Sequence, residues 1–174
     1  ITIFEKDNLK FKNINGIQIS PNAFRILREL NFDSFDQSKL CKISGVSFHD
    51  YSSNKKIATM NFNLNDQSYI ALNRSDLINF LINKFSLKDQ IIDKEVIKIH
   101  EKSILLKDEK KQDFDILVIA DGIFSNLRNK KIEPIYSGYS AFRGVFSDER
   151  QTNNIDLWMG KNFHFVKYPI DQNK

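Results

Sequence analysis

The clearest signal in the hydrophobic pattern is a run of five apolar residues, 116–120. Such a run is too short for an ordinary helix and suits a strand buried on both faces, as in a parallel sheet flanked by helices. The pair Asp121-Gly122 follows it and favours a tight turn at the carboxyl end of that strand. Ligands bind at this edge of open α/β sheets, and the nearby Ser125 and Arg128 suit a ligand that carries phosphate.

Two further segments have the pattern of amphipathic helices. Residues 20–30 begin with a serine that can cap the helix and a proline that fits its first position. Residues 73–85 begin with Asn73 and Asp76 in the spacing of a capping box. The apolar positions that we expect this second helix to bury are Leu77, Ile78, Leu81, Ile82 and Phe85.

The remaining segments alternate apolar and polar positions and predict strands. Residues 42–72 alternate around the turn-like string S-S-N-K-K, which indicates a hairpin. His49 lies in this segment, and we expect it to be a surface or hairpin histidine. Residues 91–108 predict two short strands. Residues 136–170 are strand-like and carry many aromatic residues, which we expect mostly to form a sheet core. The run 116–120, which suits a parallel sheet flanked by helices, favours the α/β fold class.

Composition and charge exclude several classes of function. No stretch approaches the roughly 20 apolar residues that span a bilayer, and the single cysteine, Cys41, fits a structural thiol in a reducing cytoplasm. The net charge of +4 comes from scattered lysine pairs with acids nearby, so we expect no nucleic-acid partner. The three histidines lie far apart, so the spacing predicts no metal site.

Five strings in this sequence together resemble one protein family. The string A-D-G-I-F-S-N-L-R resembles the Asp-Gly motif of the FAD-dependent aromatic hydroxylases, the family of the para-hydroxybenzoate and salicylate hydroxylases. The opening I-T-I-F-E-K resembles the second strand of their FAD-binding fold, and G-I-Q-I-S-P-N-A-F-R-I-L-R-E-L resembles the segment after it. N-R-S-D-L resembles their Arg-x-x-Leu helix start. Y-S-G-Y-S-A-F-R-G and H-F-V-K-Y-P-I resemble strands of their substrate domain.

The resemblance implies a Rossmann-like FAD-binding domain interleaved with a mostly antiparallel substrate sheet. Residues 1–41 and 73–135 would belong to the first, and residues 42–72 and 136–174 to the second. Two family signatures are absent from the sequence: the G-x-G-x-x-G turn that binds the pyrophosphate, expected before residue 1, and a Gly-Asp segment, expected after the last residue. We therefore expect an interior fragment of a longer enzyme; the alternative is a complete small protein.

The resemblance and the strand pattern both assign residues to the adenosine half of FAD. Glu5 ends the first apolar strand, where an acid accepts the ribose hydroxyls in dinucleotide-binding folds. A solvated acid is the alternative, and Asp7 is a rival for the role. The resemblance also implies that the backbone near Val96 lies beside the adenine.

Two further contacts to the cofactor are expected. Arg74 lies in the first turn of its helix, where a cation gains nothing from the helix dipole. A ligand outside the helix explains that position, and the resemblance implies that the ligand is FAD; a solvated arginine is the alternative. Asp121 and Gly122 would shape the turn beside the flavin, with the carboxylate acting indirectly through backbone N–H groups or ribityl hydroxyls.

His164 and Tyr168 are the candidate catalytic residues. The spacing His-x-x-x-Tyr puts both on one face of a strand, and the resemblance implies that they serve the substrate site. The alternative is a core histidine beside a packing tyrosine. The implied activity is a monooxygenase that hydroxylates a phenolic ring with NAD(P)H and O2. A ring hydroxylase of ubiquinone biosynthesis and a truncated, non-catalytic flavin-binding module are the alternatives, and the sequence indicates no oligomeric state.

Overall fold

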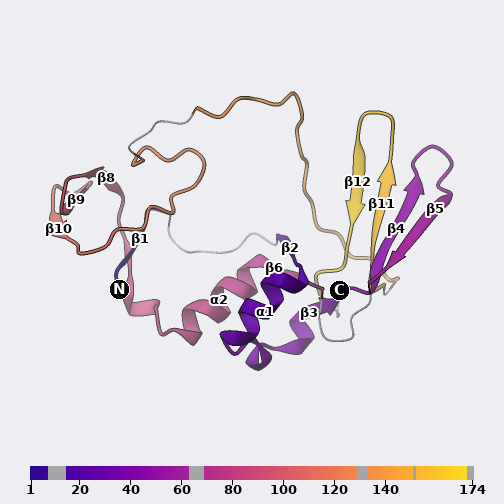
Figure 1. Cartoon of the computed structure of the whole chain (residues 1–174), viewed down its shortest axis with the longest axis horizontal. Coiled ribbons are helices and arrows are strands. Elements are labelled where there is room, and N and C mark those ends of the chain that lie inside the picture. The colour runs from indigo at the N-terminus through magenta and orange to yellow at the C-terminus, as the bar shows by residue number, and fades with distance from the viewer. Residues whose placement is uncertain (8–14, 63–68, 129–132, 151, 172–174) are drawn as a thin grey trace. The chain divides into compact units, whose positions relative to one another are not determined.

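The described residues form a mixed α/β fold with four small sheets (Figure 1). The computed structural model describes residues 1–7, 15–62, 69–128, 133–150 and 152–171. The chain divides into two compact units. The first comprises Ile1–Lys10 and Ile82–Phe142, and the second comprises Phe11–Leu81 and Arg143–Lys174.

The first unit contains a two-stranded parallel sheet and a three-stranded antiparallel sheet. Its elements are β1 (Ile3–Glu5), the 3-10 helix η3 (Lys88–Gln90), β7 (Ile91–Asp93), β8 (Val96–Ile99), β9 (Ser103–Leu106) and β10 (Lys111–Asp113). β1 pairs with β7, and β9 lies between β8 and β10. The small core of this unit includes Ile104 and Leu106 of β9, because these alternate residues share the covered face of their strand.

The second unit contains a three-stranded sheet, β2-β6-β3, and a four-stranded sheet, β12-β11-β4-β5. Its elements are β2 (Gly16–Ile19), α1 (Pro21–Glu29), η1 (Phe32–Ser34), η2 (Gln37–Lys39), β3 (Leu40–Lys42), β4 (Gly45–Asp50), β5 (Lys56–Asn61), β6 (Ile70–Asn73), α2 (Arg74–Lys84), β11 (Asn154–Met159) and β12 (His164–Lys167). The last turn of α2 passes into the first unit.

The three-stranded sheet of the second unit buries both of its faces. Alternate residues Leu40, Ile70 and Leu72 pack on one side against α1, α2 and a cluster of stacked and edge-on phenylalanines. On the other side Cys41 and Ala71 pack with residues of the four-stranded sheet and the loops around it. The period of two along the strands therefore separates two hydrophobic clusters, which fixes the register of the sheet.

Both predicted helices are confirmed. Pro21 is the first residue of α1, and the carboxamide of Asn73 caps α2 by accepting a hydrogen bond from the N–H of Ser75 at 3.1 Å. The buried face of α2 differs from the prediction at its end. Phe85 lies beyond the helix and is 46% exposed, whereas Phe80 packs into the phenylalanine cluster.

The predicted hairpin is also confirmed, because β4 and β5 pair in antiparallel fashion. β11 pairs in parallel with β4, which the sequence pattern did not predict. This pairing places residues of the last third of the chain beside the hairpin (Figure 1). None of the helices in the described ranges is long and apolar enough to cross a membrane.

The buried strand predicted at residues 116–120 is wrong. This segment forms no strand, and Ile116 and Val118 are 85% and 80% exposed. A strand buried on both faces needs neighbours for its backbone hydrogen bonds and cover for its side chains, and no described segment pairs with this one. The aromatic sheet core expected from residue 136 is wrong in its first part for the same reason, since Tyr136 and Phe142 are exposed and unpaired in any sheet.

Candidate functional site

Two acidic residues are paired at the carboxyl ends of β1 and β7. Glu5 is the last residue of β1, and its Cα partner in the parallel register is Asp93, the last residue of β7. The N–H of Asp7 donates a hydrogen bond of 3.0 Å to Oε1 of Glu5, so the turn after β1 orients this side chain. The rival acid Asp7 thus contacts Glu5 through its backbone, and Asp93 is a candidate that the sequence reasoning missed.

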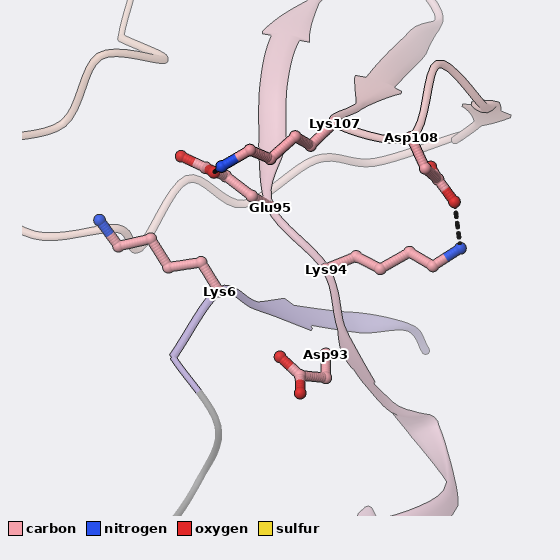
Figure 2. Close-up of a pocket in the computed structure, with 6 residues that line it drawn as sticks. All are labelled: Lys6, Asp93, Lys94, Glu95, Lys107 and Asp108. Atoms are coloured by element: carbon pink, nitrogen blue, oxygen red, sulfur yellow. Dashed lines mark hydrogen bonds and ion pairs between the residues drawn. The ribbon is translucent and has the colours of Figure 1, made fainter.

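An open pocket of about 350 Å³ adjoins this edge of the sheet (Figure 2). Its lining consists of three cations and three anions: Lys6, Asp93, Lys94, Glu95, Lys107 and Asp108. Lys6 and Asp93 come from the ends of the two paired strands, and the other four come from the turn before β8 and from the residues that follow β9. Glu5 precedes Lys6 but does not line the pocket itself.

Four of the six charged groups pair with each other. Lys94 Nζ lies 2.6 Å from Oδ2 of Asp108, and Lys107 Nζ lies 2.8 Å from Oε2 of Glu95. Their hydrogen bonds lower the pKa of both carboxyl groups and raise the pKa of Lys107. Among the described residues, Lys6 and Asp93 form no ion pair. An ammonium and a carboxylate are therefore left to bind phosphate oxygens and hydroxyl groups of a ligand.

Val96 is half-buried at the start of β8, directly after Glu95 of the pocket lining. Its Cα partner is Leu106, and the N–H of Lys107 donates to the carbonyl of Glu95 at 2.9 Å. The backbone at Val96 is thus held at the rim of the pocket by the β8–β9 pairing. This position fits the backbone role expected for Val96, which stays a prediction.

Asp121 lies in a bend, no strand precedes it, and the hydrogen-bonded turn runs from Gly122 to Ser125, with the N–H of Ser125 donating to the carbonyl of Gly122 at 3.2 Å. Gly122 has φ = +90°, a conformation that side-chain-bearing residues rarely adopt, and a β-carbon there would meet no atom within 4 Å. The guanidinium of Arg128 donates to the carbonyls of Gly122 and Ile123 at 2.6 and 3.1 Å. Arg128 therefore folds back on the turn and stabilises it, while the carboxylate of Asp121 is exposed.

Arg74 is the first residue of α2 and is exposed. Its N–H donates to the carbonyl of Asn15 at 2.8 Å, next to the pairing of Gly16 with Asn73. Its guanidinium makes no ion pair in the described part of the chain. The side chain is therefore available to an anionic ligand, as its position in the sequence suggested.

The two candidate catalytic residues have different surroundings. His164 is exposed at the start of β12, where it is the Cα partner of Met159. Tyr168 follows β12 and is half-buried against the cluster that contains Cys41 and Ala71. No hydrogen bond joins His164 and Tyr168 in the described residues. Their assignment to a substrate site stays a prediction.

His49 lies in the hairpin strand β4, as expected, but it is not a surface residue. Its side chain is 13% exposed, and its Nε2 lies 2.9 Å from Oδ1 of Asp156. Its ring also stacks on Trp158, with the ring centroids 4.8 Å apart. The physical reason is the parallel pairing of β4 with β11, which brings Asp156 and Trp158 onto the face of the sheet that carries His49.

Cys41 is a structural thiol, as expected. It is 3% exposed, and burial, followed by the nearby charge of Asp171, raises its pKa to about 11. A thiol with that pKa is protonated near neutral pH and is a poor nucleophile. Within the described ranges, no group of three or more histidine, cysteine or acidic side chains is placed to hold a metal ion.

Comparison with known proteins identifies distant relatives. The chain is 26% identical over 179 residues to a 3-hydroxybenzoate 6-hydroxylase of Aquipseudomonas alcaligenes, a match that covers 91% of this chain and 45% of the relative. It is 23% identical to a 3-amino-4-hydroxybenzoate 2-monooxygenase of Streptomyces platensis, covering 98% of this chain and 47% of the relative. No protein-family model matches the chain.

The structure resembles HpxO of Klebsiella pneumoniae, which was crystallised with FAD and uric acid. The TM-score is 0.68 at 17% sequence identity, and the match covers 91% of this chain and 45% of HpxO. The mixed α/β fold with small sheets thus matches part of the HpxO fold. The chain is a distant homologue of the FAD-dependent aromatic hydroxylases and spans about half the length of the curated relatives it matches.

Proposed function

We propose that this chain forms part of a flavin-dependent monooxygenase that hydroxylates a phenolic aromatic compound with NAD(P)H and O2. Its fold would combine a Rossmann-like FAD-binding domain with a mostly antiparallel substrate sheet. One observation carries the proposal: the parallel strands β1 and β7 end in two adjacent acids, beside a pocket whose lining includes Lys6 and Asp93, which form no ion pair with any described residue. This edge suits the adenosine half of a dinucleotide, and the distant homology points to FAD.

The residues at this edge fit the chemistry of FAD. Glu5 and Asp93 supply carboxylate oxygens that accept hydrogen bonds from ribose hydroxyls, and Lys6 supplies a cation for phosphate. Val96 would offer backbone groups to the adenine, while the Asp121-Gly122 turn would approach the flavin through its glycine. The exposed guanidinium of Arg74, at the start of α2, would suit a phosphate contact.

When bound, FAD accepts electrons from NAD(P)H and activates O2. The protein's part is to bind the ring, orient it and control its protonation. A phenol has a pKa near 10 and is far more reactive toward electrophilic oxygen as the phenolate. His164 would take the phenolic proton at a ring nitrogen, and Tyr168 would orient the substrate by hydrogen bonding.

The homology supports the choice of a phenolic substrate, since two relatives are named for hydroxybenzoates. The single buried thiol of Cys41 suits a reducing compartment, so we place the protein in the cytoplasm as part of the same proposal.

Flavin binding by the protein expressed from its complete coding sequence tests this function. We expect it to purify with FAD, or to bind added FAD, and to show the visible absorption of a flavoprotein. Glu5→Ala should weaken FAD binding about tenfold, as expected for a lost hydrogen bond to a charged group. Glu101→Ala, an exposed acid in the β8–β9 turn, is the matched control. A folded protein that binds no FAD contradicts the proposal.

A further inference from the structure

A hydrogen bond joins two residues of the second unit that are far apart in the sequence. The hydroxyl of Tyr69 donates to Oε1 of Gln18 at 2.8 Å. Tyr69 lies just before β6, and Gln18 lies in β2, where its Cα partner is the fully buried Ala71. The bond therefore spans the pairing of β2 with β6 on the face of the sheet opposite the helices.

Tyr69 is held firmly in this position. Its ring stacks on Phe62 with the centroids 4.9 Å apart, and its carbonyl accepts a hydrogen bond of 2.8 Å from the N–H of Ile43. Burial, together with the nearby Tyr168, raises the pKa of Tyr69. The phenol consequently keeps its proton at neutral pH and remains a hydrogen-bond donor to Gln18.

The bond fixes which end of the Gln18 carboxamide is free. A carboxamide has one oxygen acceptor and an NH2 group with two donors. Tyr69 occupies the oxygen, so the NH2 group must point elsewhere, and it donates to no partner in the described part of the chain. No buried side-chain polar atom there lacks a partner, so this NH2 group is accessible to solvent or to a ligand.

Gln18 lies on a strand that adjoins residues proposed to bind ligands. Gln18 shares its face of β2 with Gly16, two residues earlier, and the ring of Tyr168 lies against Gly16. Asn73, the Cα partner of Gly16, immediately precedes Arg74. A residue proposed to contact the substrate and one proposed to contact the cofactor thus approach the same end of β2.

We propose that Tyr69 is a positioning residue that holds Gln18 so that its NH2 group donates to an acceptor oxygen of the bound ligand. This inference rests on the proposed function and extends it. The acceptor is an electron-rich oxygen on a planar conjugated group. It belongs either to a carbonyl of the flavin or to the aromatic substrate, whose phenolate or carboxylate would supply it. The two sources predict different measurements.

The test uses Tyr69→Phe and Gln18→Leu in the protein expressed from its complete coding sequence. Tyr69→Phe removes only the hydroxyl and keeps the stacking on Phe62. If the acceptor belongs to the flavin, both variants raise the Kd for FAD about tenfold and shift the flavin absorption maximum without substrate. If it belongs to the substrate, both raise KM about tenfold and leave FAD binding unchanged. Either result supports the proposal.

Non-additivity separates positioning from a general structural role. Tyr69→Phe should have no further effect on Kd or KM in a Gln18→Leu background, because the hydroxyl acts only through the carboxamide. Tyr51 is an exposed tyrosine of the hairpin, so Tyr51→Phe is the control. It should change neither the Kd for FAD nor KM. If the wild type binds FAD and Tyr69→Phe changes neither the Kd for FAD, the flavin spectrum nor KM, this inference is overturned while the proposed function stands. A wild type that binds no FAD overturns the proposed function as well.

Discussion

The ring of Tyr168 lies directly against the backbone of Gly16. A β-carbon built on Gly16 would lie 2.8 Å from both Cε2 and the hydroxyl oxygen of Tyr168, and 2.6 Å from Cγ2 of Ile170. These separations are far below van der Waals contact, so a side chain at residue 16 would force Tyr168 or Ile170 to shift. The close approach anchors the proposed substrate residue Tyr168 to the three-stranded sheet.

Replacing Gly16 by alanine should therefore displace Tyr168. We expect the free energy of unfolding to fall by about 1–3 kcal/mol, the usual cost of overpacking, and KM for the aromatic substrate to rise. Urea denaturation and steady-state kinetics measure the two effects. Gly144→Ala is the control, because a β-carbon there meets nothing within 4 Å. Unchanged stability in Gly16→Ala would show that Tyr168 does not pack as described.

Local patterns in the sequence predicted the elements that are stabilised by local contacts. The period of the apolar residues, Pro21 and the capping Asn73 located both helices within one or two residues, and the alternation around residues 51–55 located the β4–β5 hairpin. In the candidate site, the strand-end position of Glu5 and the positive φ of Gly122 were predictable for the same reason, whereas the strand expected before Asp121 is absent.

Features that depend on distant segments were not predictable. His49 and Asp156 are 107 residues apart, and only the parallel pairing of β4 with β11 brings them together. Asp93 likewise becomes a neighbour of Glu5 only through the β1–β7 register. The run 116–120 has the composition of a strand, but a strand also needs a neighbour to pair with. No described segment pairs with this run.

The carboxylate of Asp148 should make stability depend on pH. Hydrogen bonds from Arg150 and then from Lys167 hold the pKa of this carboxyl well below its usual range. Because this pKa is lower in the folded state, the carboxylate of Asp148 stabilises the fold fully at any pH above the carboxyl pKa of the unfolded chain, near 3.9. It is lost as the pH falls from there through the folded pKa.

Comparison of the wild type with Asp148→Asn isolates this contribution. The difference in unfolding free energy should be constant from about pH 5 to neutral pH and should shrink progressively below about pH 4. Urea titrations across that range measure it. Asp115 is an exposed acid without a partner among the described residues. For Asp115→Asn, the difference in unfolding free energy from the wild type should not change with pH. A difference between wild type and Asp148→Asn that grows on acidification would contradict the assignment.

Asp121→Ala should affect the flavin indirectly. A carboxylate beside a pyrophosphate would repel it, so we expect Asp121 to bind backbone N–H groups or ribityl hydroxyls and thereby shape the turn. Its removal should weaken FAD retention or slow flavin reduction by NAD(P)H, about tenfold for a lost hydrogen bond to a charged group. Equilibrium FAD binding and stopped-flow reduction test this. The proposed role is rejected if both match the wild type, and Asp115→Ala controls for loss of charge nearby.

His164→Ala should impair hydroxylation without releasing FAD. His164 is exposed on β12 and so is accessible to a ligand, and a histidine is suited to accept a phenolic proton near neutral pH. Without it the substrate must ionise unaided, which becomes favourable only as the pH approaches the phenol's pKa near 10. The activity of the variant relative to wild type should therefore recover as the pH rises.

Coupled NAD(P)H consumption and product formation between about pH 6 and pH 9 would measure this recovery. His100→Ala, in the turn between β8 and β9, is the control and should follow the wild-type profile. A purely structural role for His164 predicts a loss that does not depend on pH and is accompanied by lower stability. If His164→Ala hydroxylates the true substrate normally throughout this range, His164 does not act as the base, and Tyr168 loses its proposed partner.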